Sequence, residues 1–270
     1  MPARYPERIV CLTEESTETL YLLGEEHRIV GISGYTVRPA RARREKPRVS
    51  AFLSAKTDRI LELQPDLVIG FSDLQADIAR DLAKAGLNVL IFNQRSVDEI
   101  LSMILALSSL VGATDKGRVL IRKLEQGLGE IREAARRLPK RPKVYFEEWD
   151  EPMISGIRWV SELIEIAGGE EVFSDRSHSH AATGRIVSAD EVREKNPEVI
   201  LGSWCGKKFR PERVAARPGW QAIAAVKAKR LYEIKSADIL QPGPAALTDG
   251  VRRIHELLKD SVSRAPRTSS

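Results

Sequence analysis

The chain has 270 residues, of which 42% are hydrophobic and 30% are charged, so it can bury a sizeable core. Its formal net charge is +5, but the cations are spread along the chain and no aromatic-rich nucleic-acid motif accompanies them. We therefore expect no nucleic acid as a partner. The one dense basic run, residues 38–48, has a proline near each end and is expected to be a solvated loop.

Two isolated cysteines, Cys11 and Cys205, make neither a disulfide framework nor a zinc site by themselves, and we expect them in different lobes. Cys11 lies in an apolar run, which predicts a buried core thiol. No segment has the apolar length of a membrane span, so the protein is not expected to be membrane-embedded. The N-terminus shows no signal-peptide pattern, which predicts a cytoplasmic protein as written and a periplasmic one if a signal has been removed.

The first third of the chain alternates strand-like and helix-like segments. Apolar runs of four or five residues predict strands at 8–12, 28–32, 66–70 and 88–92. Helical spacing predicts helices at 14–23, 57–63 and 74–85, with Thr13 or Ser16 as N-cap of the first. This rhythm predicts an α/β fold with a mainly parallel sheet covered by helices on both faces.

The middle of the chain is helical. One helix is predicted over residues 97–110, and Gly112 separates it from a second helix over 114–138 that stops before Pro139. At 1.5 Å per residue the second helix is roughly 37 Å long, enough to run from one lobe to another. The predicted organisation is an N-terminal lobe at 1–96, a helical linker at 97–139 and a C-terminal lobe at 140–270.

The last part of the chain repeats the alternation of strands and helices. Strands are predicted at 143–149, 198–204 and 230–234, and helices at 159–167, 188–194, in part at 217–226, and at 247–259. Ser188 is the predicted cap of the helix at 188–194. A weak internal echo links the two halves, because residues 63–70 (LQPDLVIG) resemble residues 195–202 (KNPEVILG). Two similar lobes in one chain would produce this echo.

Several segments together resemble one known family. They are RIVCLTEESTETLYLLGEEHRIVGIS, ILELQPDLVIG, FEEWDEPMISGIRWVSELIEIAGGEEVF and NPEVILGSWCGKKF, and the likeness extends from about residue 8 to 258. The chain resembles the periplasmic-binding-protein family for vitamin B12 and ferric siderophores, closest to its cobalamin-binding branch. The resemblance implies two α/β lobes with mainly parallel sheets, joined by one long rigid helix, and a ligand between them.

The resemblance also implies an ABC permease as partner, although two features depart from the family pattern. Family members carry an export signal, and none is visible here. They also present a surface acid on each lobe to the permease. The first-lobe position falls near residues 74–77, where Asp73 and Asp77 are the nearby acids and no Glu stands.

Four aromatic residues follow the ends of predicted strands, two in each half: Tyr35, Phe71, Trp149 and Trp204. Strand ends in parallel sheets line ligand crevices, and a flat corrinoid would pack on such rings. The alternative is that these aromatics cap the core. Other residues expected to contact the ligand are Gln94, Arg95, Glu148, Ser155, Cys205 and Gln241.

Acidic and imidazole side chains add to this prediction. Glu147 and Glu148 are consecutive in a strand and should point to opposite faces, so at most one of them faces the ligand, and we expect contact from Glu148 or Trp149. His178 and His180 lie in a polar loop, and we predict that one of them coordinates the cobalt of a bound corrinoid. The alternative is that both rings are solvated and have no role.

The predicted function is non-enzymatic binding of a cobalamin-like corrinoid, as an ABC-transporter-type substrate-binding protein or a cytoplasmic derivative. No nucleophile elbow, P-loop, zincin or dinucleotide motif is present. One alternative is a siderophore or haem-like iron chelate held by cations such as Arg95, Arg158, Arg176 and Lys207. Another is a metal-site enzyme or metallocofactor assembly factor using Glu147, His178, His180 and Cys205. A third is an interaction module without a small ligand.

Overall fold

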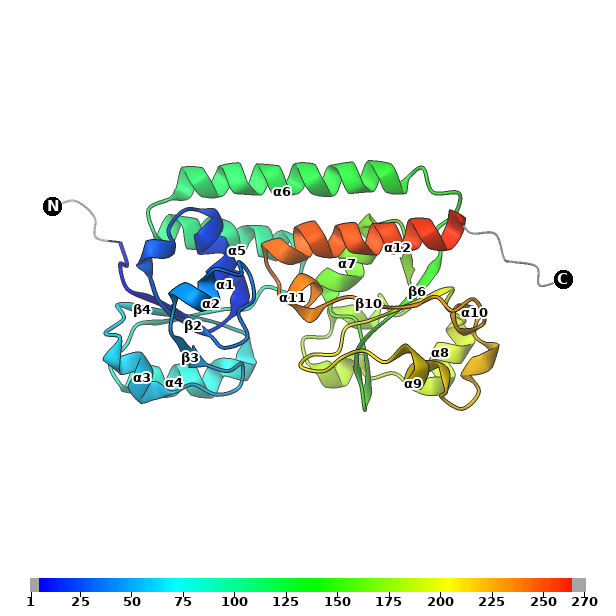
Figure 1. Ribbon diagram of the computed structural model, residues 1–270, viewed down its shortest axis with the longest axis horizontal. Helices are drawn as coiled ribbons and strands as arrows, with labels where there is room; N and C mark the ends of the chain where they lie inside the picture. Colours follow the sequence, from blue (N-terminus) through cyan, green and yellow to red (C-terminus); the bar gives the residue numbers. More distant parts are fainter. Residues whose placement is uncertain (1–4, 264–270) are drawn as a thin grey trace. The chain divides into compact units, whose positions relative to one another are not determined.

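The computed structural model describes residues 5–263, which divide into two compact units (Figure 1). Within the described residues, unit 1 comprises 5–94, 98–124 and 241–245, and unit 2 comprises 95–97, 125–240 and 246–263. Helix α6 (Thr114–Ala135) belongs to unit 1 up to Leu124 and to unit 2 beyond it, which confirms the predicted long connecting helix. It ends three residues earlier than predicted, because the last turn before Pro139 is a tighter, 3₁₀-type turn. There the backbone amides of Arg137 and Leu138 donate hydrogen bonds to the carbonyls three residues earlier in the chain.

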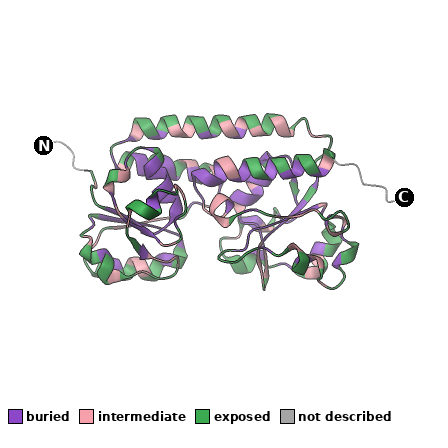
Figure 2. Cartoon of the chain, in the orientation of Figure 1, coloured by how far each residue is buried: buried purple, intermediate pink, exposed green. Residues whose placement is uncertain are grey.

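The sheet of unit 1 is fully parallel, with strand order β3-β2-β1-β4-β5. Its central strands β1 and β4 are buried, as Figure 2 shows, and consist mostly of aliphatic residues, which is typical of a sheet covered on both faces. Burial raises the pKa of Cys11, in β1, to about 12, so the prediction of a core thiol is confirmed. The strands are β1 (Ile9–Cys11), β2 (Ile29–Ser33), β3 (Arg48–Ser50), β4 (Leu67–Phe71) and β5 (Val89–Phe92).

Helices flank this sheet, and those predicted from periodicity are present with shifts of one or two residues. The exception is the helix predicted at 74–85, which begins with the separate turn η2. The helices of this half are α1 (Glu14–Leu22), η1 (Glu26–Arg28), α2 (Ala42–Glu45), α3 (Thr57–Glu62), η2 (Asp73–Gln75), α4 (Ala76–Lys84) and α5 (Val97–Leu110). Thr13 precedes α1 as predicted, but its side chain makes no capping hydrogen bond.

The basic run at 38–48 is not the plain solvated loop that the sequence predicts. It contains α2, buries Ala42 and leads directly into the edge strand β3. Two of its arginines fix it to the unit, because Arg38 pairs with Glu18 at 2.9 Å and Arg41 pairs with Glu26 at 2.6 Å. Ion pairing therefore orders a segment whose composition alone predicts exposure.

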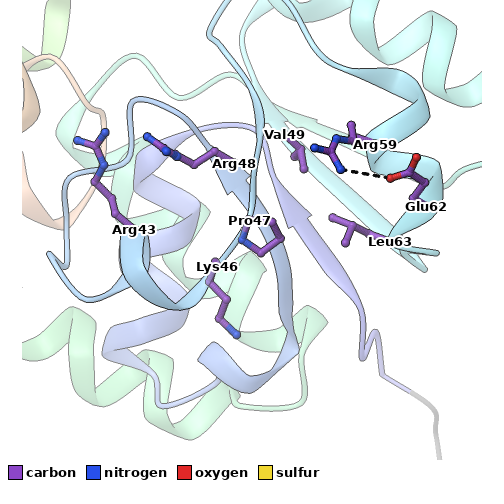
Figure 3. Close-up of a pocket in the computed structure, with 8 residues that line it drawn as sticks. All are labelled: Arg43, Lys46, Pro47, Arg48, Val49, Arg59, Glu62 and Leu63. Carbon is purple, nitrogen blue, oxygen red and sulfur yellow. Dashed lines mark ion pairs between the residues drawn. The ribbon is translucent and has the colours of Figure 1, made fainter.

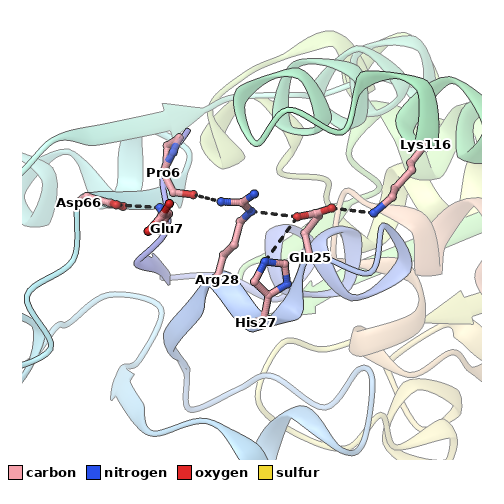
Figure 4. Close-up of polar contacts among 7 residues, drawn as sticks. All are labelled: Pro6, Glu7, Glu25, His27, Arg28, Asp66 and Lys116. Carbon is pink, nitrogen blue, oxygen red and sulfur yellow. Dashed lines mark hydrogen bonds and ion pairs between the residues drawn. The ribbon is translucent and has the colours of Figure 1, made fainter. Parts of the chain in front are cut away.

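A polar network attaches α6 and the first strand to the rest of unit 1 (Figure 4). Arg28 donates to the Glu25 carboxylate at 2.9 Å and to the Pro6 carbonyl at 2.8 Å, and Lys116 of α6 pairs with Glu25 at 2.7 Å. Burial alone would raise the pKa of Glu25, but Lys116 and Arg28 lower it below its usual value. The carboxylate of Asp66 accepts bonds from the backbone amides before β1.

The sheet of unit 2 is mixed, with order β10-β9-β6-β7 and β8 paired to β6. The predicted strands are present, whereas β7 and β8 were not predicted because they are short and lack an apolar run. Only β7 runs antiparallel, since it returns from β6 through a tight connection. The strands are β6 (Lys143–Asp150), β7 (Met153–Ser155), β8 (Glu170–Glu171), β9 (Val199–Gly202) and β10 (Leu231–Glu233).

The helices of unit 2 are mostly short. Helix α8 begins with the predicted cap, because Ser188 and Glu191 form a reciprocal capping box. The closing helix begins as a π-helical turn, which the sequence does not reveal. The elements are α7 (Arg158–Ile166), η3 (Arg176–His178), η4 (Ala182–Arg185), α8 (Ala189–Lys195), α9 (Pro211–Ala215), η5 (Trp220–Ala222), α10 (Ala224–Lys227), α11 (Ser236–Ile239), η6 (Ala246–Gly250) and α12 (Val251–Ser263).

An aromatic cluster forms the core on one side of this sheet. The Tyr145 ring contacts those of Phe173 and Trp220 edge-on, with centroids 5.7 and 6.3 Å apart. Trp204 packs edge-on against Phe209 at 5.0 Å. The Phe209 ring lies directly over Gly202, where a Cβ atom would collide with it.

The sequence echo between the two halves has a structural basis. Gln64 and Asn196 both adopt left-handed backbone, with φ of 44° and 45°, and each is followed by a proline and then by a buried strand. The same helix end therefore introduces β4 in unit 1 and β9 in unit 2.

Candidate functional site

Exposed apolar side chains follow three strands of the unit 1 sheet, β2, β3 and β4. Tyr35 and Val37 follow β2, Leu53 follows β3 and Leu74 follows β4, and these side chains are 55%, 38%, 68% and 60% exposed. Because the carboxyl ends of parallel strands share one edge of the sheet, we treat the four residues as one feature, the apolar rim. Large apolar side chains exposed at a sheet edge of this kind are typical of a binding surface.

Buried polar contacts hold the loops that carry the apolar rim. The Gln75 side chain accepts from the Phe71 amide at 3.0 Å and donates to the Phe52 carbonyl at 2.9 Å, so it ties the β4 loop to the β3 loop. The Gly34 amide donates to the Ser50 carbonyl at 2.7 Å. Ser72 has φ of 69°, and its hydroxyl accepts from the Leu74 amide, which places Leu74 at the surface. These hydrogen bonds therefore hold the loops of the apolar rim in place before a ligand binds.

Three carboxylates at the start of α1 lie behind the same sheet edge: Glu14, Glu15 and Glu18. Glu14 accepts from the Val37 amide at 3.4 Å, and Glu18 accepts from Arg38 and from the Ala245 amide. One oxygen of Glu15 accepts from the Thr13 hydroxyl at 2.6 Å, and its other oxygen has no hydrogen-bond partner within residues 5–263. Burial raises the pKa of Glu14 and of Glu15 to about 7.

The turn at 241–244, which contains the predicted ligand contact Gln241, packs against these acids through Gly243. A Cβ atom on Gly243 would lie 2.5 Å from the Cβ of Glu15, so only glycine allows this approach. Gln94 donates its side-chain amide to the Pro242 carbonyl at 3.0 Å, while its own oxygen is buried without a partner among the described residues. Gln94 is buried and Gln241 is half-buried, and both belong to unit 1.

In unit 2 two consecutive acids of β6, Glu147 and Glu148, form ion pairs with arginines. Glu147 is fully buried and forms a two-pronged pair with Arg217 at 2.5 and 2.9 Å. It also accepts from the Trp204 indole and the Tyr145 hydroxyl, each at 3.1 Å. Glu147 is therefore a structural acid with its hydrogen-bonding capacity used.

The Glu148 side chain has different partners from that of Glu147, as predicted for the next residue of a strand. It pairs with Arg185 through bonds of 2.5 and 3.2 Å. Arg185 is 2% exposed and also donates to the Ser155 carbonyl at 2.6 Å, while the Ser155 hydroxyl donates to the Arg185 carbonyl. Ser155 is thus buried in a structural contact, and Glu148 keeps only a half-exposed edge.

The four predicted aromatic contacts divide into two pairs. Phe71 and Trp204 are 6% and 2% exposed and belong to the packed interior, whereas Tyr35 and Trp149 present a surface. The Trp149 ring carries the Lys207 ammonium 4.0 Å from its centroid, and Lys207 also pairs with Asp150. Cys205 is exposed in the loop after β9.

His178 and His180 are both exposed, and their segment contains more secondary structure than the polar loop that the sequence predicts. It contains η3 and η4, and Arg176 fixes it by pairing with Glu191 and donating to the Ile186 carbonyl. Within residues 5–263 no three His, Cys, Asp or Glu side chains form a metal site. The proposed set of Glu147, His178, His180 and Cys205 is therefore not assembled, and Glu147 is already bound by Arg217. Cobalt coordination by a single histidine stays a prediction.

Sequence reasoning did not identify Val37, Leu53, Leu74 or the acids of α1 as site residues. Leu74 was assigned to a helix, and Leu53 lies in a stretch without periodicity. Their signal is exposure, which a single sequence does not show. Arg95, the remaining predicted contact, is half-buried after β5. None of the helices in the described part of the chain is both long and apolar enough to cross a bilayer.

A family model described as periplasmic binding protein matches residues 9–237. The chain belongs to the periplasmic binding protein family. The vitamin B12-binding protein of Vibrio cholerae serotype O1 is 28% identical over 264 residues, covering 94% of this chain and 89% of that protein. An ABC transporter substrate-binding lipoprotein of Bacillus subtilis, YvrC, is 26% identical over 261 residues, covering 93% and 79%.

The solved structures show the same fold. The heme-binding protein RhuT from Roseiflexus sp. RS-1, in its apo form, superposes with a TM-score of 0.77 at 24% identity, covering 93% of this chain and 99% of that chain. The α/β architecture of this periplasmic binding protein is thus shared with proteins named for different flat metal chelates. The fold alone does not select among such ligands, and the side chains at the strand ends must do so.

Proposed function

We propose that this periplasmic binding protein is the substrate-binding component of an ABC transporter and that its ligand is a cobalamin-like corrinoid. The observation that carries the proposal is the apolar rim, backed by buried hydrogen-bond acceptors on Glu15 and Gln94. A corrin offers a broad apolar macrocycle with amide arms, and amides donate hydrogen bonds to such acceptors. The vitamin B12-binding relative from Vibrio cholerae supports the same ligand class.

Charge favours a corrinoid over a haem or a carboxylate-bearing siderophore. Haem carries two carboxylates, and the acids at the start of α1 would repel them when ionised. Among the cations suggested for anionic chelates, Arg158 and Arg176 already pair with Glu162 and Glu191. Lys207 beside Trp149 is the feature that favours the haem-like alternative, since it places a cation at a flat aromatic surface.

The direct test is co-elution of the purified protein with cyanocobalamin or with hemin in size-exclusion chromatography, followed by visible absorbance. We expect cyanocobalamin to elute with the protein at micromolar concentration and hemin to be retained less. Retention of hemin alone would replace the corrinoid with the haem-like alternative. If the protein retains neither compound, both proposed ligands are ruled out.

The transport role predicts that the protein is located outside the cytoplasmic membrane and that it binds a permease. The family and the Bacillus subtilis lipoprotein support this assignment. Asp73 and Asp77, both exposed after β4, are the acids available near the position where family members meet their permease, and Asp77 pairs with Arg80 at 2.8 Å. Fractionation of the native cells tests the location, since recovery only in the cytoplasmic fraction would contradict it.

A further inference from the structure

A basic pocket lies beside the edge strand β3 of unit 1 and shares no residue with the apolar rim. Its cavity measures about 360 Å³ (Figure 3). Four cations line it, namely Arg43, Lys46, Arg48 and Arg59, against one acid, Glu62. Three of these cations belong to the basic run at 38–48, and the fourth, Arg59, belongs to α3.

Most of these cations have no ion-pair partner among residues 5–263. Arg59 pairs with Glu62 at 3.6 Å. Arg43, Lys46 and Arg48 make no hydrogen bond or ion pair through their side chains to any residue between 5 and 263, although Arg43 acts through space on Glu14. Arg38 and Arg41 of the same run are paired with Glu18 and Glu26. The run therefore separates into cations that hold the fold and cations that do not.

The unpaired arginines are oriented alike. In Figure 3 the side chains of Arg43 and Arg48 extend toward the same side of the pocket, whereas Lys46 points the other way and Arg59 faces Glu62. Two like charges on one side repel each other, and an anion placed there would relieve this repulsion. Paired guanidinium groups are suited to a phosphate, which offers several acceptor oxygens and close to two negative charges at neutral pH.

The pocket also has an apolar wall, made by Pro47, Val49 and Leu63. A cavity of about 360 Å³ exceeds what a single inorganic phosphate needs, so the wall leaves room for an organic group beside the anion. We propose that this pocket binds an organic phosphate, with its phosphate on Arg43 and Arg48 and its organic part against Pro47. This binding is independent of the ligand at the apolar rim.

Isothermal titration at low ionic strength with ADP as the probe tests the proposal. We expect saturable binding that weakens as salt is added, because exposed charges are screened. The double variant Arg43→Gln, Arg48→Gln should weaken ADP binding by about tenfold or more, since each charged hydrogen bond contributes substantially. The matched control, Arg44→Gln with Arg122→Gln, removes the same charge from exposed positions outside the pocket and should bind ADP as the parent does.

A second arm identifies the source of the phosphate. The parent and both variants are sedimented with phosphatidylcholine vesicles, with and without phosphatidylglycerol. Binding of phosphatidylglycerol vesicles but not ADP, lost in the pocket variant and kept in the control, supports a phosphate site that takes a lipid headgroup. Binding of neither probe, or an equal loss in both double variants, overturns the proposal. Cyanocobalamin binding measured on the same samples reports separately on the apolar rim.

Discussion

The strand ends of the two units are built differently. In unit 1 they expose Tyr35, Leu53 and Leu74 and bury acids whose pKa is raised by burial. In unit 2 two consecutive acids of β6 form ion pairs, Glu147 with Arg217 and Glu148 with Arg185. Two sheets with similar entry turns to β4 and β9 thus carry different chemistry.

This difference separates groups available to a ligand from groups committed to the fold. A buried carboxylate with a two-pronged arginine partner has little left to offer a ligand, and removal of its partner leaves a buried charge. A buried carboxyl without a cation partner has a raised pKa and keeps a free acceptor oxygen, as Glu15 does. We therefore expect residues of unit 1, rather than those of unit 2, to determine which ligand binds.

The largest expected effect is the loss of the buried pair in unit 2. Arg217→Ala leaves the Glu147 carboxylate buried without its cation, and we expect the free energy of unfolding to fall by about 3–5 kcal/mol. Urea unfolding followed by tryptophan fluorescence measures it. The double variant Glu147→Leu, Arg217→Met serves as control and should lose less. A change below about 1 kcal/mol in Arg217→Ala would show that the pair is not a structural element.

The next effect concerns the acids of unit 1 and the pH dependence of stability. Because burial raises the pKa of Glu15 to about 7, the folded state holds a proton that the unfolded state releases near pH 4.5. Stability from this group is complete below pH 4.5 and is lost as the pH rises through 7, by roughly 3 kcal/mol. Glu15→Gln should flatten the decline of the urea midpoint between pH 5 and 8. Equal slopes in parent and variant would contradict the raised pKa.

Burial raises the pKa of Glu171 in unit 2 to about 8, so part of the decline will remain in that variant. Glu171→Gln provides the comparison, since it should remove the portion of the slope at higher pH. Glu148→Gln serves as a further comparison, because it removes the ion pair with Arg185 and should lower stability.

The smallest expected effect is spectroscopic. If one of the exposed histidines coordinates cobalt, the double variant His178→Ala, His180→Ala should retain bound cobalamin but alter its visible spectrum. Both residues are exposed, so the stability of the protein should change little. A bound-state spectrum identical to that of the parent would eliminate histidine coordination and leave the aromatic and amide contacts.

The sequence predicted those parts of the fold that depend on local pattern. Apolar runs located β1, β4 and β9, and the Ser188 signal located the start of α8, because periodicity and capping act over a few residues. The missed β7 is defined by its pairing with β6, and the order in residues 38–48 depends on Glu18 and Glu26, which lie elsewhere in the chain. Aromatic identity could not separate buried Trp204 from accessible Trp149, since both end a strand.

The central claim, that the apolar rim of unit 1 carries ligand recognition, is tested most directly by isothermal titration with cyanocobalamin. We expect the parent to bind at micromolar concentration or tighter, and Tyr35→Ser with Leu53→Ser to bind about tenfold more weakly. The control, Leu22→Ser with Val119→Ser, removes apolar side chains that are 53% and 57% exposed elsewhere in unit 1 and should match the parent. No binding by the parent, or equal affinity in the rim and control variants, would contradict the claim.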